Sequence, residues 1–318
     1  MHAAPARPLP EGGRAVTTLN LQNVSRWYGN VVAVNDITMS LGPGVTGLLG
    51  PNGAGKTTVL HMMAGFLAPS RGSVTLDDAP AWRNPAIYKQ LGLVAEKEAV
   101  HGFLTAREFV HASAKMHKLP DPKAATEWAL EMVEMTAAAD RRIETYSKGM
   151  RQRTRVAAAL VHNPQVLLLD EPFNGMDPRQ RMHMMALLHE LGDRGHTILF
   201  SSHILEEVEQ VSGTVQVMVA GRLAASGDYR RIRRLMTNRP HVFAVKSSDD
   251  RKLAVALIAE KSVNGVEIAG EGLTVRAGDY GSFTRALPRI ALGEGIRLRK
   301  VIPSDESLES VFSYLLEA

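Results

Sequence analysis

The chain has 318 residues, of which 45% are hydrophobic and 22% charged, with a formal net charge of +4 and no cysteine. These values are typical of a globular protein that is long enough for two domains, and they exclude disulfides and cysteine catalysis. No apolar run approaches the ~20 residues of a membrane-spanning helix. The mild positive charge suits phosphates, anionic lipid or nucleic acid without choosing among them.

An extension and a small sheet are predicted first along the chain. Residues 1–17 are rich in Ala, Pro, Gly and Arg and have no apolar core, so we expect a disordered extension rather than a signal peptide. Apolar and polar side chains alternate over residues 18–41, which predicts an antiparallel sheet. Tyr28 lies between the two runs, where an aromatic ring either packs on strands or stacks on a purine. The motifs that follow favour stacking.

Residues 50–57, Gly-Pro-Asn-Gly-Ala-Gly-Lys-Thr, fit the pattern G-x-x-x-x-G-K-[ST]. An apolar run at 45–49 predicts a strand before the loop, and the periodicity of 57–66 predicts a helix after it. This context disfavours a chance glycine-rich turn. Glycines let backbone N–H groups wrap a polyphosphate, and the helix N-terminus adds its positive dipole end. The predicted nucleotide-binding residues are Gly50, Asn52, Gly53, Ala54, Gly55, Lys56, Thr57 and Thr58.

Lys56 is expected to reach the outer phosphates, and the Thr57 hydroxyl to hold Mg²⁺. Further strands are expected at 72–76 and at 91–95, the second ending at Glu96. The helical pattern of residues 105–138, broken at 119–122, predicts a helical insertion. Residues 146–153 then open a helix that runs to about residue 161.

An apolar run at 166–169 ends in Asp170 and Glu171, as expected of a strand buried on both faces of a parallel sheet. Acids at this end of such a strand reach the crevice where ligands bind. We expect Asp170 to bind the Mg²⁺ shell, and Glu171 to accept a proton from the water that attacks the γ-phosphate. For a single acid, the alternative interpretation is a helix cap or a solvated strand end. The presence of two acids in succession disfavours this alternative.

The strand–helix alternation from residue 45 to about 220 predicts a mostly parallel α/β core. Within it, Asp177 is expected to cap a helix that begins at Pro178. A buried strand at 197–202 ends at His203. A lone histidine at a strand end is usually a surface residue, whereas its position on the ligand edge favours a functional role.

Over about residues 19–235 the chain resembles the ATP-binding subunit of ABC transporters, because separate motifs occur in the order of that family. Tyr28 resembles the adenine-stacking aromatic residue, residues 50–57 the Walker A loop, and residues 166–171 the Walker B strand with its catalytic glutamate. Residues 146–150, Tyr-Ser-Lys-Gly-Met, resemble the signature sequence. Asp177 falls at the D-loop aspartate and His203 at the switch histidine.

The resemblance implies a P-loop NTPase core with an antiparallel β-subdomain and a helical insertion over residues 18–236, with ATP and Mg²⁺ as cofactors. It implies catalysis by Glu171 and His203. It also implies a head-to-tail dimer with a second ATP-binding subunit, identical or a sister chain. In that dimer, Ser147 and Gly149 of one subunit contact the γ-phosphate of ATP in the other, where Asp177 also lies at the interface.

Two positions depart from the pattern of the family. The family usually carries glutamine where this chain has Glu96, and a carboxylate there can still ligate Mg²⁺. A solvated loop acid is the alternative. The signature is more commonly Leu-Ser-Gly-Gly-Gln, so Lys148 and Met150 leave the strength of the contact across the dimer open.

Residues 240–318 are predicted to form a separate accessory domain. The order of expected elements is β-α-β-β-α-β, which is typical of a small α+β ferredoxin-like domain, followed by a helix at 307–316. The tail at 303–312 resembles the tails of ATPase subunits that serve ABC-2 type export permeases. An arginine cluster at 230–234 either faces an anionic surface or a partner loop, or is the solvated face of a linker helix.

The leading hypothesis is therefore a transport-coupled ATPase subunit, peripheral on the cytoplasmic face of the membrane, that moves a separate integral membrane permease. The helical insertion is expected to receive a helix of that permease. The alternatives are a soluble ABC-type ATPase that acts on ribosomes or nucleic acid, and an ATP-sensing regulator. A single set of motifs without sustained heptads argues against the first, so no nucleic-acid partner is expected.

Overall fold

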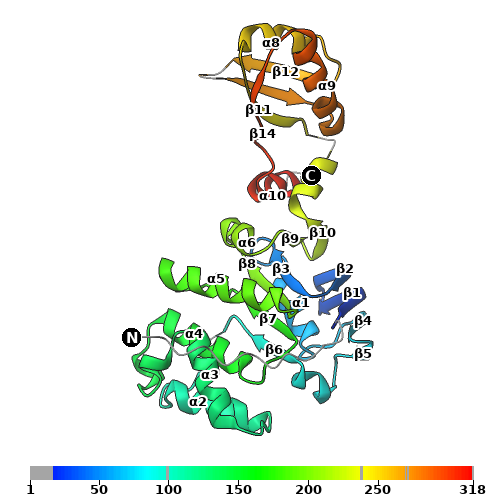
Figure 1. Ribbon diagram of the computed structural model, residues 1–318. Helices are drawn as coiled ribbons and strands as arrows, with labels where there is room; N and C mark the ends of the chain where they lie inside the picture. The colour runs from blue at the N-terminus through cyan, green and yellow to red at the C-terminus, as the bar shows by residue number, and fades with distance from the viewer. Residues whose placement is uncertain (1–16, 98–99, 237–238, 269, 271, 317–318) are drawn as a thin grey trace. The chain divides into compact units, whose positions relative to one another are not determined.

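The computed structural model describes residues 17–97, 100–236, 239–268, 270 and 272–316. The chain divides into two compact units, residues 1–203 with 220–223 and residues 204–219 with 224–318 (Figure 1). Of the predicted extension at residues 1–17, residues 1–16 lie outside the described residues. The prediction is wrong for Thr17, which is buried and whose hydroxyl donates to Gln165 Oε1. The domain boundaries expected near residues 236 and 240 stay a prediction.

A four-stranded antiparallel sheet opens the first unit, as the alternating pattern predicts. Its strands are β1 (Leu19–Tyr28), β2 (Val31–Leu41), β4 (Arg71–Leu76) and β5 (Ala79–Pro80), in the order β2-β1-β4-β5. β4 lies against β1, and Gly72 permits this approach. A Cβ on Gly72 would lie 2.3 Å from the Asn23 carbonyl oxygen, and its φ of +81° is a conformation that favours glycine.

Four parallel strands form the core of the first unit. They are β3 (Gly44–Leu49), β6 (Leu91–Val94), β7 (Val166–Asp170) and β8 (Thr197–Ser202), in the order β3-β8-β7-β6. Every residue of β7 and β8 is buried, as expected for parallel strands covered on both faces. The helices α1 (Lys56–Met63) and α5 (Pro178–Asp193) pack against these strands, which confirms the predicted parallel α/β core.

The helical insertion is also present in the first unit. Its elements are α2 (Ala106–Met116), α3 (Pro122–Met132) and the short 3₁₀ turn η2 (Thr136–Ala138). The 3₁₀ turn η3 (Ile143–Thr145) and the helix α4 (Lys148–Leu160) follow it, and another 3₁₀ turn, η1 (Pro85–Lys89), precedes β6. α2, α3 and α4 pack on one another (Figure 1). Thr105 and Glu108 form a capping box at the start of α2, and Asp121 caps α3 through the Ala124 N–H. In the part of the chain that the structure describes, no helix is long and apolar enough to cross a membrane.

The second unit begins with elements that the sequence analysis did not assign individually. They are α6 (Leu205–Val211), β9 (Thr214–Val219), β10 (Arg222–Asp228), whose first two residues belong to the first unit, and α7 (Tyr229–Leu235). Arg233 of α7 is fully buried and pairs with Asp305, while Arg234 pairs with Glu306. The solvated-face interpretation is therefore wrong for Arg233, whereas the Arg234 side chain stays about half exposed beside Glu306. Asp305 and Glu306 lie far along the sequence, and only folding brings them to α7.

The remainder of the second unit has the predicted ferredoxin-like topology. β11 (His241–Ser247), β12 (Val263–Ile268), β13 (Leu273–Ala277) and β14 (Leu298–Pro303) form an antiparallel sheet in the order β12-β13-β11-β14. The helices α8 (Asp250–Ile258) and α9 (Tyr280–Gly293) share one core with it (Figure 1). Phe243, Leu253, Val275 and Phe283 are central to that core.

Two details of this region differ from the sequence prediction or extend it. β14 starts at Leu298 rather than at Ile296, because the end of α9 continues through Gly295 at φ +67° and the Ile296 N–H donates to the Ala291 carbonyl. The last helix, α10 (Leu308–Leu316), packs against α6 and α7 within the second unit.

Candidate active site

The phosphate loop connects β3 to α1. Gly55 immediately precedes α1 with φ +98°, a conformation that glycine adopts without strain. Lys56 is buried, and its Nζ donates to the carbonyl oxygens of Gly50 at 2.7 Å and Pro51 at 3.3 Å. Burial lowers the pKa of Lys56, although the carboxylates of Glu171, Asp170 and Glu96 act in the opposite direction.

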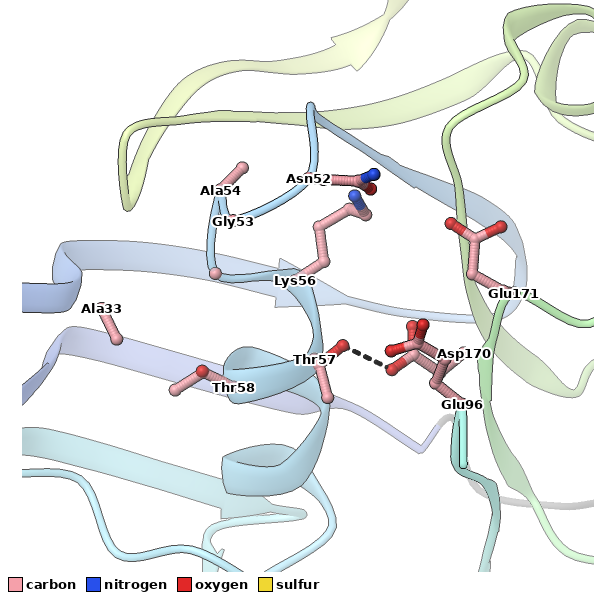
Figure 2. A pocket seen from close by; sticks show the side chains of 11 residues that line it. Ala33, Asn52, Gly53, Ala54, Lys56, Thr57, Thr58, Glu96, Asp170 and Glu171 are labelled. Carbon is pink, nitrogen blue, oxygen red and sulfur yellow. Dashed lines mark hydrogen bonds between the residues drawn. The ribbon is translucent and has the colours of Figure 1, made fainter. Parts of the chain in front are cut away.

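A pocket of about 310 Å³ lies at this loop, and Figure 2 shows the side chains around it. Ten of its eleven residues were predicted as site residues, and the exception is Ala33. A small neutral side chain on a strand carries no signal in sequence, so Ala33 was not identifiable as a site residue. The lining residues are Ala33, Asn52, Gly53, Ala54, Gly55, Lys56, Thr57, Thr58, Glu96, Asp170 and Glu171.

The two acids at the end of β7, Asp170 and Glu171, are held in place by hydroxyl groups. Thr57 Oγ1 donates to Asp170 Oδ2 at 2.7 Å, as the dashed line in Figure 2 marks. Ser201, at the end of β8, donates its hydroxyl to Asp170 Oδ1 and accepts a hydrogen bond from the Glu171 N–H at 2.9 Å. Sequence reasoning assigned no role to Ser201, because only the pairing of β7 with β8 brings its side chain to the acids.

His203 reaches the pocket through Glu171. Its Nδ1 donates to the Glu171 carboxylate, with distances of 2.9 Å to Oε2 and 3.0 Å to Oε1. The Glu171 side chain is only 13% exposed, whereas His203 is about half exposed. Glu171 also adopts a positive φ of +51°, which is uncommon for a residue with a side chain and is typical of functional sites. The structure therefore brings together the two residues that were predicted to act in catalysis.

Glu96 lines the same pocket as Asp170 (Figure 2). Together with the Thr57 hydroxyl, these carboxylates supply the oxygen ligands that a hard divalent cation prefers. Among the described residues, no group of three or more His, Cys, Asp and Glu side chains forms a metal site by itself. The donor set thus fits a cation such as Mg²⁺ that takes its other ligands from nucleotide phosphates and water.

Tyr28 is the last residue of β1 and is 47% exposed. The guanidinium carbon of Arg26 lies 4.8 Å from the centroid of its ring, and Arg26 Nη1 donates to the Ala68 carbonyl at 3.2 Å. Tyr28 does not line the 310 Å³ pocket. The Arg26 contact holds the ring at the end of the strand and leaves much of its surface accessible.

The signature residues lie on α4, outside the pocket of their own chain. Ser147 caps this helix, and its Oγ accepts from the Met150 N–H at 3.2 Å. Gly149 is buried against the turn that follows β7, and a Cβ on Gly149 would lie 2.8 Å from the Gly175 carbonyl oxygen. Asp177 caps α5 by accepting from the Gln180 N–H at 2.9 Å. Gly149 therefore packs on residues on both sides of Asp177 within one chain.

This fold and site define a P-loop nucleotide hydrolase, in which a glycine-rich loop opens a helix and an acidic pair ends another parallel strand of the same sheet. The profile of the ABC transporter family matches residues 34–174. The chain is 32% identical over 301 residues to the bacitracin transport ATP-binding protein BcrA of Enterococcus faecalis, covering 94% of this chain and 96% of that protein. It belongs to the ATP-binding subunits of ABC transporters.

Other relatives agree with this assignment. The Nod factor export ATP-binding protein I of Rhizobium leguminosarum bv. viciae is 32% identical over 268 residues, which cover 83% of this chain and 85% of that protein. A solved ATP-binding subunit of an ABC transporter superposes with a TM-score of 0.63 at 26% identity, covering 68% of this chain and 92% of that chain. A dimeric bacterial ABC transporter cassette, at 22% identity and a TM-score of 0.61 over 65% of this chain and 97% of that one, shares the fold. The chain is an ATPase that binds ATP.

Proposed function

We propose that this chain is the ATP-hydrolysing subunit of a membrane exporter, and that it works at the cytoplasmic face of the membrane with a separate permease. The relatives that support this proposal are named for bacitracin transport and Nod factor export, and the alignments span 94% and 83% of this chain. The assignment of hydrolysis rests on the Glu171 carboxylate, which is mostly buried and accepts a hydrogen bond from His203 beside the phosphate loop.

The proposal assigns three roles to residues in and beside the pocket. The N–H groups of residues 50–58 and the Lys56 ammonium group bind the phosphates. Thr57, Asp170 and Glu96 hold Mg²⁺, which neutralises phosphate charge when bound. Glu171 accepts the proton of the attacking water, and His203 keeps the Glu171 carboxylate oriented toward that water.

The site is completed by a second ATP-binding subunit. Ser147 and Gly149 do not line the pocket of their own chain, and in this proposal they contact the γ-phosphate held by the other subunit. A hydroxyl and a backbone N–H at a helix N-terminus suit an anion. Asp177 lies at the same interface, and Tyr28 stacks on adenine. ATP then closes the dimer and hydrolysis releases it.

An apolar groove of about 750 Å³ is the docking site that we propose for a helix of the permease. Phe66, Tyr88, Phe109 and Met116 line it, and Phe66 and Met116 are largely exposed. An exposed cluster of large apolar side chains is typical of a surface that a partner covers. The helices α2 and α4 contribute to this groove, so docking there would link the helical insertion to the motion of the permease.

Glu171→Gln tests the assignment of hydrolysis. The variant keeps size and polarity but cannot accept the proton, so we expect turnover to fall by about 10²–10⁴-fold while ATP binding persists. Steady-state phosphate release and binding of a fluorescent ATP analogue measure the two effects. ATP-dependent dimers should accumulate in gel filtration. Unchanged turnover would refute the role of Glu171.

Met116→Glu tests the groove. A buried charge opposes docking, so membrane fractions that contain a co-expressed candidate permease should retain less of this variant than of the wild type. Met182→Glu is the matched control, because Met182 is also an exposed methionine on a helix but does not line the groove. Equal retention of both variants would contradict docking in the groove. Failure of the wild type itself to be retained would contradict the exporter assignment.

A further inference from the structure

We propose that Arg155 is a positioning residue that holds Glu96 and Glu171 in place for metal binding and hydrolysis. Arg155 lies on α4, is 8% exposed, and carries a charge in a mostly buried position. Its hydrogen bonds reach the chain on both sides of Glu96 and, through Gln152, the peptide of Glu171. The inference rests on the role proposed above for Glu96.

The first contact is with the loop after β6. Arg155 Nη2 donates to the carbonyl oxygen of Ala95 and, at 3.0 Å, to that of Lys97. These two carbonyls flank Glu96 directly. Among the described residues, no side chain or backbone group makes a hydrogen bond to the Glu96 carboxylate, so the backbone on either side determines where this carboxylate lies. A guanidinium with several donors in one plane suits such a two-point contact.

The second contact runs toward the catalytic acid. Arg155 Nη1 donates to Gln152 Oε1 at 2.6 Å, and Gln152 Nε2 lies 3.4 Å from the carbonyl oxygen of Glu171. Gln152 is also buried. The helix that begins at the signature therefore supports both Glu96 and Glu171 through one hydrogen-bonded chain, so a shift of α4 would move the two acids together.

Arg155 also borders the apolar groove proposed for the permease helix. Ala95, Lys97 and Arg155 line that groove, while Glu96 between them lines the nucleotide pocket. A helix seated in the groove therefore contacts the same short loop whose opposite side carries a proposed metal ligand. Arg155 determines how firmly this loop is held, which gives the groove a physical connection to the hydrolysis site.

Hydrogen exchange on the protein without nucleotide or metal tests the structural part of the inference. In Arg155→Ala, the peptide containing residues 93–97 should exchange faster than in the wild type, because the donor to both flanking carbonyls is gone. Arg155→Gln serves the same comparison if the alanine variant does not fold, because its short neutral side chain cannot reach both carbonyls. Wild-type exchange in the folded variant would overturn the inference.

Metal binding tests the functional part. We expect Arg155→Ala to weaken Mn²⁺ binding to the complex with a non-hydrolysable ATP analogue, measured by electron paramagnetic resonance, by about 10-fold or more. The Mg²⁺ concentration for half-maximal turnover should rise in parallel, with a smaller change in KM for ATP. Arg155→Lys keeps the charge and should lie closer to the wild type than Arg155→Ala.

Arg153→Ala is the matched control. Arg153 lies on the same helix, is 7% exposed, and donates to the carbonyls of Val133 at 3.1 Å and Glu134 at 3.0 Å. It should lower thermal stability as Arg155→Ala does, but leave Mn²⁺ binding and the exchange of residues 93–97 at wild-type values. If Arg153→Ala and Arg155→Ala lost Mn²⁺ binding equally, the effect of Arg155→Ala would be explained by a general loss of stability. That result would overturn the inference.

A double-mutant cycle with Glu96→Ala separates this inference from the function on which it rests. If Arg155 acts through Glu96, Arg155→Ala should have little further effect on Mn²⁺ binding once Glu96 is removed. Unchanged Mn²⁺ binding in Glu96→Ala alone would reject Glu96 as a metal ligand. A loss in Glu96→Ala with none in Arg155→Ala would reject only the positioning role of Arg155.

Discussion

Lys56 illustrates how opposing effects act on a single side chain of the pocket. Burial lowers its pKa because the charged ammonium group loses hydration, while Glu171, Asp170 and Glu96 favour the charged form. A bound polyphosphate adds further negative charge and favours the charged form more strongly. Nucleotide binding and the protonation of Lys56 therefore support each other.

Tyr28 allows a prediction at the same scale. Stacking of a base on an aromatic ring contributes about 1–3 kcal/mol, so Tyr28→Ala should raise the KM for ATP by roughly 5-fold to 150-fold, with a smaller change in kcat. Tyr28→Phe keeps the ring over which Arg26 lies and should remain near the wild type. Steady-state kinetics with ATP measure both variants. A similar KM in all three proteins would show that Tyr28 does not stack on the base.

The elements of the first unit bring the pocket together at one edge of the parallel sheet. β8 lies between β3 and β7, so the phosphate loop after β3 and the acids after β7 emerge on the same side. The carboxyl ends of parallel strands are the usual location of ligand sites in open α/β sheets. Ser201 at the end of the intervening strand then bonds to Asp170 and Glu171.

Two histidines join α2 to the end of α4. The rings of His117 and His162 are stacked, with centroids 3.7 Å apart and an interplanar angle of 6°. Burial lowers the pKa of His162 to about 4, and burial also lowers the pKa of His117. His162 Nε2 lies 3.3 Å from the Leu91 carbonyl oxygen, as expected of a neutral donor.

This pair predicts how stability depends on pH. The folded protein protonates His162 near pH 4, whereas the unfolded chain protonates it near its ordinary value of 6.5, so the unfolded state binds more protons between these values. Stability from His162 is complete above pH 6.5 and is lost as the pH falls toward 4, by up to about 3 kcal/mol. Between pH 7.5 and pH 5, the free energy of unfolding measured with urea should fall less in His162→Gln than in the wild type. An equal fall in the two proteins would contradict the assignment of this pH dependence to His162.

At the scale of the whole molecule, the proposed site is divided between two copies or two sister subunits. The phosphate loop and the acids converge within one chain, but Ser147 and Gly149 do not reach that pocket. Gly149 is instead packed against Gly175 of the same chain, so the signature has a fixed position on its own subunit. This arrangement predicts that two inactive subunits can complement each other.

Mixing two variants tests this prediction. Lys56→Ala removes phosphate binding, whereas Ser147→Asp keeps an N-cap residue on α4 but places a negative charge near the partner's γ-phosphate. Each variant alone should be nearly inactive, and the mixture should regain turnover because one of its two sites has both intact halves. Ser147→Asn, a neutral cap, should retain more activity than Ser147→Asp. A mixture no more active than its components would argue against the shared site.

The sequence by itself determined the features that depend on neighbouring residues. The strand, loop and helix around residues 50–57, the apolar run before Asp170, and the caps at Ser147 and Asp177 all follow from local pattern and backbone preference. The ferredoxin-like order of the last elements was also predictable, because alternation and helical periodicity are visible in short segments.

Only the tertiary structure decided which remote side chains meet. Ser201 orients the acids because β7 and β8 are paired, and Arg155 reaches both carbonyls beside Glu96 because α4 packs near β6. Arg233 is buried against Asp305, 72 residues away, although its local sequence resembles a solvated basic face. These contacts depend on packing between distant segments, and no local pattern of residues specifies such packing.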